Sequence, residues 1–101
     1  MSTIIVLFNL KPGVDRAEYE QWARDTDLPE VRRLGSVDGF EILRAEGQLS
    51  GAPSPYDYCE IIRVGDLAAF DADLASEAIQ RVAAEYLQYA DAPVFIRTEA
   101  L

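Results

Sequence analysis

A chain of 101 residues, half of them hydrophobic and 27% charged, has the composition of one globular domain, so we expect residues 1–101 to fold as a single unit. Its net charge of -9 argues against nucleic acid and anionic membranes as partners, because both are bound by basic surfaces. The chain has one cysteine, Cys59, and no histidine, which excludes an internal disulfide, cysteine-rich zinc sites and the commonest catalytic base; we expect neither a metal nor a cofactor.

The first third of the chain predicts a strand followed by a helix. Residues 3–10 form a continuous aliphatic and β-branched run, which is typical of a strand. Asp15 and Glu18 have the spacing of a capping box and predict a helix that starts there. Asp27 precedes Pro29 by two residues, a pattern that favours a second cap and a short helical piece ending before Gly35.

The rest of the chain predicts three strands and a long helix. A second strand is expected around residues 39–45, and a third at 56–64. The Gly-, Ser- and Pro-rich residues 47–55 between them predict an exposed connection, which could act as a lid. Asp66 is expected to cap a long helix with a break at Ser76, and a last strand is expected at 94–99.

The predicted order, strand-helix-strand-strand-helix-strand, is that of an α+β ferredoxin-like fold. Such a βαββαβ chain forms an antiparallel four-stranded sheet with two helices on one face. The first strand adds a further expectation, because Ile4 through Phe8 are apolar without the alternation of a sheet with one wet face. Both faces should therefore be covered, and a second copy packed through the sheet face opposite the helices would cover the outer one. We expect a homodimer.

The N-terminal sequence carries no sign of export. The first ten residues lack a basic leader, and their apolar run is too short to span a bilayer. These features predict a soluble protein of the cytoplasm that does not bind a membrane.

Five segments of the sequence match a known group of proteins. They are Tyr19-Glu-Gln-Trp22, Arg24-Asp-Thr-Asp27-Leu-Pro29-Glu-Val, Val37-Asp-Gly-Phe40-Glu-Ile, Asp66-Leu-Ala-Ala-Phe70 and Leu74-Ala-Ser76-Glu. On these segments the whole chain resembles the dimeric α+β barrel superfamily, which includes EthD-like proteins and antibiotic-biosynthesis monooxygenases. Within the superfamily it is most similar to the REDY-like HapK family, which is associated with pathways to prodiginines, the tripyrrole pigments.

The resemblance implies a pocket between the sheet and the helices, at the end of the first helix, and a role in bacterial secondary metabolism. EthD-like relatives commonly carry a histidine two residues before the proline, where this chain has Asp27. A mechanism that needs that histidine therefore does not carry over.

Three residues are candidate catalytic groups. Asp27 could exchange protons if its pocket is dry, since burial raises the pKa of a carboxyl, although it could equally be a helix cap. Tyr58 and Glu60 share one face of the predicted third strand, where they could orient and protonate a ligand. Glu60 could instead pair across the sheet with Arg44 or Arg97.

Five further residues are candidate ligand-binding groups. Trp22 could form a platform for a flat ligand or pack in the core, and Tyr19 lies one turn before it. Arg44 could bind an enolate or carboxylate or form an ion pair, and the same alternatives apply to Arg63. Asn9 could donate a hydrogen bond in the cleft or brace a turn.

Together these features predict a homodimeric protein that binds a small apolar or aromatic metabolite. If it is an enzyme, the expected chemistry is cofactor-free acid–base catalysis, as a cyclase, isomerase or dehydratase acting on an aromatic, pyrrole or polyketide intermediate. The alternative is a non-catalytic carrier or accessory protein. An enzyme should hold a carboxyl of raised pKa in a cavity, whereas a carrier should have its carboxylates in ion pairs or caps.

Overall fold

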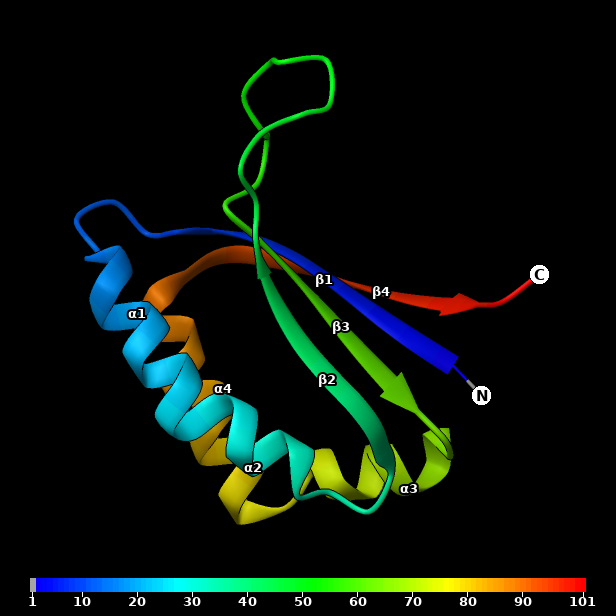
Figure 1. Ribbon diagram of the computed structural model, residues 1–101. Coiled ribbons are helices and arrows are strands. Elements are labelled where there is room, and N and C mark those ends of the chain that lie inside the picture. Colours follow the sequence, from blue (N-terminus) through cyan, green and yellow to red (C-terminus); the bar gives the residue numbers. More distant parts are fainter. Residues whose placement is uncertain (1) are drawn as a thin grey trace.

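The computed structural model describes residues 2–101 as four strands and four α-helices (Figure 1). The strands are β1 (Ser2–Leu10), β2 (Val37–Arg44), β3 (Tyr58–Val64) and β4 (Ala90–Glu99). The helices are α1 (Arg16–Trp22), α2 (Leu28–Arg32), α3 (Leu67–Leu74) and α4 (Glu77–Tyr89), and a π-helical turn, η1 (Ala23–Asp27), joins α1 to α2.

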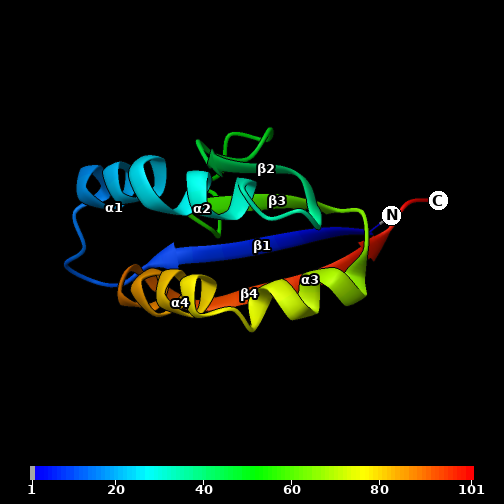
Figure 2. The ribbon, with the colours of Figure 1, turned by 90° about the horizontal axis from the view of Figure 1, so that it is seen from below.

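The strands form one antiparallel sheet in the order β2-β3-β1-β4. The helices lie on one face of it, as Figure 1 shows. In Figure 2 the arm α1–η1–α2 follows β2 and β3, while α3 and α4 follow β4. This arrangement confirms the predicted ferredoxin-like fold. Strand β4 starts earlier than predicted, at Ala90, and accommodates Pro93 because an edge strand can lack one hydrogen-bond donor.

The arm from Arg16 to Arg32 is one continuous helix with a wide turn in its middle. Asp15 caps its start by accepting a hydrogen bond from the Ala17 amide, as predicted. The prediction of a second cap at Asp27 is wrong, because Asp27 has helical backbone angles and its side chain accepts no capping bond. Instead the Leu28 N–H donates to the carbonyl of Ala23, five residues back, as in a π-turn.

The second helical arm breaks where predicted. Asp66 caps α3 by accepting from the amides of Ala68 and Ala69 at 3.0 and 3.2 Å. Ser76 caps α4 and accepts from the Ile79 amide at 3.4 Å. The arm can therefore change direction at Ala75–Ser76 while both helix starts keep their amide groups satisfied.

The core lies between the sheet and the helices, and the inner face of β1 forms part of it. Val6 and Phe8 point toward the helices and are at most 1% exposed. Ile5 and Leu7 point to the opposite face and are only half-buried in the single chain. A second copy on that face remains a prediction.

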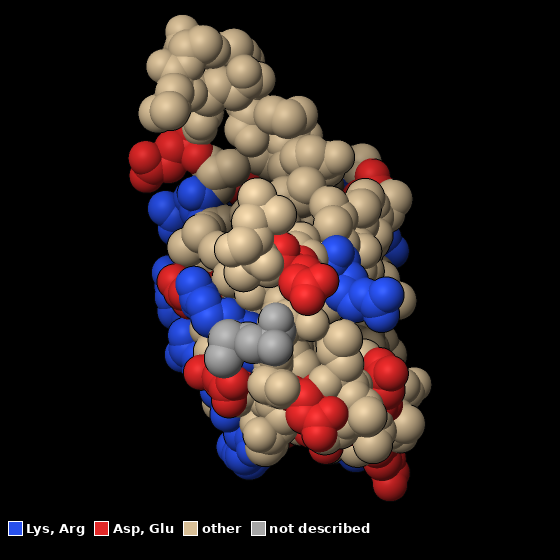
Figure 3. Space-filling view, turned by 90° about the vertical axis from the view of Figure 1, so that its right-hand side faces the viewer, with Lys and Arg blue, Asp and Glu red and all other residues tan. Residues whose placement is uncertain are grey.

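The long β2–β3 connection projects from one end of the sheet (Figure 1). Residues 47–56 carry no charged side chain, so the projection is uniformly tan in Figure 3. Across residues 2–101, none of the helices combines the length and the apolar character needed to cross a membrane.

Candidate functional site

Asp27 and Glu60 line the same cavity between the sheet and the helices, which we call the apolar cavity. Its volume is about 110 Å³, and the two carboxyls are 5% and 4% exposed. The remaining lining is apolar apart from the hydroxyl of Tyr86, and comes from Val31, Leu34, Phe40, Ile62, Phe70, Leu74, Ile79, Val82, Ala83, Tyr86 and Phe95. Phe95 is 60% exposed, so the cavity reaches the molecular surface at the β4 edge.

The sheet register explains why Glu60 has no cationic partner. Its cross-strand neighbours are Ile42 on β2 and Val6 on β1, both apolar. Arg44 lies opposite Tyr58 instead, and Arg97 lies opposite Ile4. The alternative that Glu60 pairs across the sheet with either arginine is therefore wrong, and among residues 2–101 its side chain forms neither a hydrogen bond nor an ion pair.

The wide turn of η1 turns Asp27 toward the sheet. A proline ring collides with the carbonyl four residues back in a regular α-helix, and a π-turn immediately before Pro29 relieves that collision. Asp27 is consequently buried on the inner face of the arm, where no arginine or lysine of residues 2–101 contacts its carboxyl. The spacing that suggested a cap instead produces a buried carboxyl.

Three buried polar atoms lie near this carboxyl pair without a hydrogen-bond partner within residues 2–101. They are the hydroxyls of Tyr19 and Tyr86 and the Oε2 atom of Glu60. Tyr19 comes from α1, Tyr86 from α4 and Glu60 from β3, so three elements converge on one place. Buried polar groups are nearly always paired in native proteins, and three unpaired ones together indicate a place for a ligand or water.

Burial and mutual repulsion keep protons on this cluster. Burial raises the pKa of Asp27 to about 7. Burial, and then the charge of Asp27, raises the pKa of Glu60 well above its ordinary range. Burial likewise raises the pKa of Tyr19 and Tyr86, and the carboxyls add to the effect. Near neutral pH the carboxyl pair therefore holds at least one proton, and both hydroxyls remain neutral.

A second cavity, which we call the polar cavity, holds the other predicted polar residues. It has a volume of about 240 Å³ and is lined by Tyr19, Glu20, Ala23, Arg24, Leu28, Ile42, Arg44 and Tyr58. The structure therefore brings Asp27 and Glu60 together but places Tyr58, the third predicted catalytic residue, in a different cavity. Tyr19 also lines the polar cavity, and burial, followed by the charges of Glu60 and Asp27, raises the pKa of its hydroxyl.

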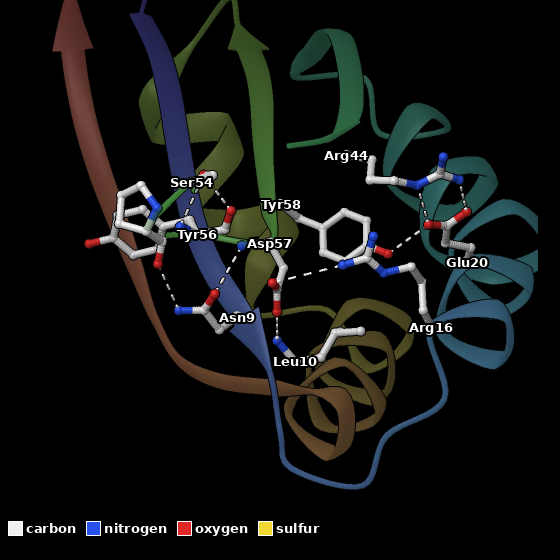
Figure 4. Close-up of polar contacts among 10 residues, drawn as sticks. Asn9, Leu10, Arg16, Glu20, Arg44, Ser54, Tyr56, Asp57 and Tyr58 are labelled. Atoms are coloured by element: carbon white, nitrogen blue, oxygen red, sulfur yellow. Dashed lines mark hydrogen bonds and ion pairs between the residues drawn. The ribbon is translucent and has the colours of Figure 1, made fainter. Parts of the chain in front are cut away.

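Glu20 is the centre of the polar cavity (Figure 4). It accepts hydrogen bonds from the Tyr58 hydroxyl at 2.6 Å and from Arg44 Nε at 2.7 Å, and Arg44 Nη2 is also bonded to it. Its pKa falls to about 2, chiefly because of the hydrogen bond from Arg44. Burial, followed by the bond to Glu20, raises the pKa of Tyr58 to about 12. Arg44 and Tyr58 are thus occupied by a carboxylate of the chain itself.

Trp22 and Asn9 lie outside both cavities. The indole N–H of Trp22 donates to Glu85 at 3.0 Å, and its ring packs on Tyr89 and Tyr19 in the core. Asn9 accepts from the Asp57 amide and donates to the Pro55 carbonyl, so it braces the end of the β2–β3 connection (Figure 4). Arg63 forms an ion pair of 2.7 Å with Glu41 on the outer face of the sheet.

Two residues of these cavities were not predicted. Tyr86 lies on the inward stripe of the last helix, where an aromatic side chain suggests packing, and only its polar tip indicates a site. Glu20 lies beside Tyr19 on a helix face expected to be exposed, and its partners come from two distant strands. Within residues 2–101 no cluster of acidic or cysteine side chains is arranged to hold a metal ion.

The sequence matches one family along almost its whole length. The model for the family of REDY-like protein HapK matches residues 2–101. HapK from Hahella chejuensis is 31% identical, with a TM-score of 0.83, over 100% of this chain and 93% of that one. No match was found among curated proteins.

More distant solved structures share the fold alone. An EthD family protein from Bacillus halodurans has a TM-score of 0.78 at 13% identity over the full length of both chains. SnoaB, a cofactor-independent oxygenase from Streptomyces nogalater, has a TM-score of 0.78 at 18% identity, over 98% of this chain and 91% of that one. These likenesses support the ferredoxin-like fold and carry no residue role to this chain.

Proposed function

The chain belongs to the REDY-like HapK family and has the fold of small-molecule-binding α+β barrel proteins, and from its site we propose that it is a cofactor-free acid–base enzyme. Its substrate is a small, largely apolar ring compound of bacterial secondary metabolism, and its reaction is a cyclisation, isomerisation or dehydration. Solved structures of similar fold include SnoaB and an antibiotic biosynthesis monooxygenase. These two proteins support the assignment to secondary metabolism. A prodiginine-like pigment pathway is the setting that the family suggests.

One observation supports catalysis over carriage. Asp27 and Glu60 line one apolar cavity, where neither side chain caps a helix or pairs with a cation of residues 2–101. A protein that merely carries a ligand has no need of two buried carboxyls of raised pKa, which cost stability. A general acid or base works best when its pKa lies near the ambient pH, and burial brings that of Asp27 to about 7.

The carboxyl pair can both give and accept a proton. In a dehydration, the protonated carboxyl gives its proton to the departing hydroxyl while the ionised one takes a C–H proton. Water leaves, and the pair ends with the same number of protons. The Tyr86 hydroxyl, which lines the same cavity and has no partner among residues 2–101, would donate a hydrogen bond to an oxygen that gains negative charge. Tyr58 and Arg44, which are bonded to Glu20, would shape the neighbouring polar cavity.

The proposal includes a homodimer formed through the outer face of the sheet. On this face one row runs across the four strands as Val94, Leu7, Cys59 and Leu43, and Val94 and Leu43 are each 44% exposed. The ion pair between Arg63 and Glu41 lies beside them. An apolar centre with a polar border is the usual composition of a protein interface.

The test is a screen of ring-containing pathway intermediates for binding and turnover, repeated with Asp27→Asn and Glu60→Gln. We expect each variant to keep binding and to lose about 100-fold or more in kcat, the usual contribution of a general acid or base. Asp71→Asn, which changes an exposed carboxyl on α3, is the matched control and should retain full activity. Unchanged turnover in both cavity variants would exclude the acid–base assignment. Binding without turnover across the screen would favour the carrier.

A further inference from the structure

The carboxyl pair of the apolar cavity lacks any positive charge to balance it. Glu60 is 4% exposed and its Oε2 atom has no partner, while Asp27 is 5% exposed. No lysine or arginine among residues 2–101 lines this cavity. Buried carboxyls elsewhere are normally paired with a cation or with several hydrogen-bond donors. A positively charged ligand would complement this site.

We propose that the ligand of the apolar cavity carries a protonatable nitrogen, as an amine or imine on a small ring, and binds as the cation between Asp27 and Glu60. This inference rests on the proposed function, which places a small ring compound in the same cavity. It adds the chemical class of that compound and its charge when bound.

The electrostatics of the cavity favour a cation over neutral or anionic ligands. A cation beside both carboxyls lets the pair ionise, so each oxygen gains a charge-assisted hydrogen bond in a medium of low dielectric constant. An anion would be repelled by the ionised carboxylate, just as the charge on Asp27 already opposes ionisation of Glu60. A neutral ligand would leave the pair protonated and gain only ordinary hydrogen bonds.

The other groups that face the pair stay neutral and leave its charge uncompensated. Tyr19 faces it from α1 and Tyr86 from α4, and burial raises the pKa of both hydroxyls. Arg32 of α2 donates to the Phe40 carbonyl at 2.9 Å and is thus directed to the β2 edge. Helix α3 and strand β4 supply the apolar side chains of Phe70, Leu74 and Phe95. Only Asp27 and Glu60 therefore change charge near neutral pH.

The dimensions of the cavity limit the size of the ring. Its volume is about 110 Å³. An engineered apolar cavity of about 150 Å³ holds benzene, so this one suits a ring of about five atoms with a single substituent. Cyclopentylamine, cyclopentanol and cyclopentanecarboxylate are matched probes, because they share the ring and differ only in the charge of one group.

The test is calorimetric titration of the three probes into the intact protein between pH 5 and 8. Cyclopentylamine should bind at least tenfold more tightly than cyclopentanol at pH 7, and cyclopentanecarboxylate should bind least. The bound ammonium displaces one proton from the carboxyl pair into the buffer. Between pH 5 and pH 7, amine affinity should therefore increase by up to about tenfold for each unit by which the pH is raised. The binding heat should depend on the ionisation enthalpy of the buffer.

Replacing both carboxyls separates the charge effect from the shape of the cavity. The double variant Asp27→Asn, Glu60→Gln should bind cyclopentanol as the parent does, lose the preference for the amine and release no proton. Retained cyclopentanol binding shows that the variant is folded. Equal binding of amine and alcohol by the parent would overturn this inference and leave the proposed function standing. Tightest binding of the carboxylate, or failure of all three probes to bind, would likewise overturn the inference, and neither result bears on the turnover test of the proposed function.

Discussion

At the scale of single residues, Asp27 makes the stability of the protein depend on pH in an unusual direction. Its pKa is about 7 in the folded chain against an ordinary value of 3.8, so the folded state holds more protons than the unfolded state between these values. This stabilising contribution is complete below about pH 4 and is lost as the pH rises through 7. One pKa unit corresponds to about 1.4 kcal/mol, so Asp27 alone accounts for up to about 4 kcal/mol.

We predict that the free energy of unfolding falls from pH 5 to pH 8 by a few kcal/mol, measured by urea denaturation at fixed protein concentration. Asp27→Asn should flatten this slope and be more stable than the parent at pH 8. Asp71→Asn should keep the parental profile. Below about pH 4.5 stability should fall again, because the pKa of Glu20 is lowered to about 2 and its ion pair with Arg44 is lost on protonation. Parental stability that rises from pH 5 to 8 would contradict the assignment.

Residue patterns predicted part of the candidate site, and long-range contacts decided the rest. The period of two in a strand was enough to place Tyr58 and Glu60 on the inner face of β3. That pattern could not show that Glu20, 38 positions before Tyr58, occupies the tyrosine hydroxyl. Nor could it show that apolar residues would flank Glu60 across both neighbouring strands. Contacts between elements distant in sequence determine which carboxyl is paired with an arginine and which has only apolar neighbours.

At the scale of elements, local signals were sufficient wherever a helix starts on its own cap. Asp15, Asp66 and Ser76 were each predicted from residue type and spacing, and each side chain accepts an amide hydrogen bond at the expected place. Asp27 has the same residue type ahead of a proline, yet the helix continues through it. The π-turn lets α1 and α2 both pack on the sheet, so it depends on tertiary contacts. Residue type alone does not distinguish it from a break in the helix.

The cap of α3 gives a prediction at this scale. Asp66→Ala removes the acceptor for the amides of Ala68 and Ala69 and should lower the free energy of unfolding by about 1 kcal/mol. Asp66→Asn keeps a capping oxygen and should come within a few tenths of a kcal/mol of the parent. Urea denaturation at pH 7 measures both. Equal losses in the two variants would show that charge rather than capping stabilises this helix end.

At the scale of the whole molecule, the pattern of β1 connects the fold to its assembly. A ferredoxin-like sheet with helices on one face needs only one apolar face, yet the centre of the outer face of this sheet is apolar on β1, β3 and β4. Ile5 of β1 lies between Ile61 of β3 and Ile96 of β4, and Ile96 remains 41% exposed in the single chain. A second sheet placed on this face would bury all three side chains, and sheets stack in this way at about 10 Å.

We predict that the protein has twice the 11.2 kDa mass of its chain when measured by analytical ultracentrifugation at low micromolar concentration. Ile5→Lys places a charge at the centre of the outer face, between Ile61 and Ile96, and should yield a monomer, because an unpaired charge buried between two sheets is strongly unfavourable. Leu49→Lys, at a fully exposed position of the β2–β3 connection, adds the same charge away from that face and should leave the dimer intact. A parental monomer would show that the outer face of the sheet is not an interface between copies. A dimer that survives Ile5→Lys but not Leu49→Lys would move the interface to the projecting connection.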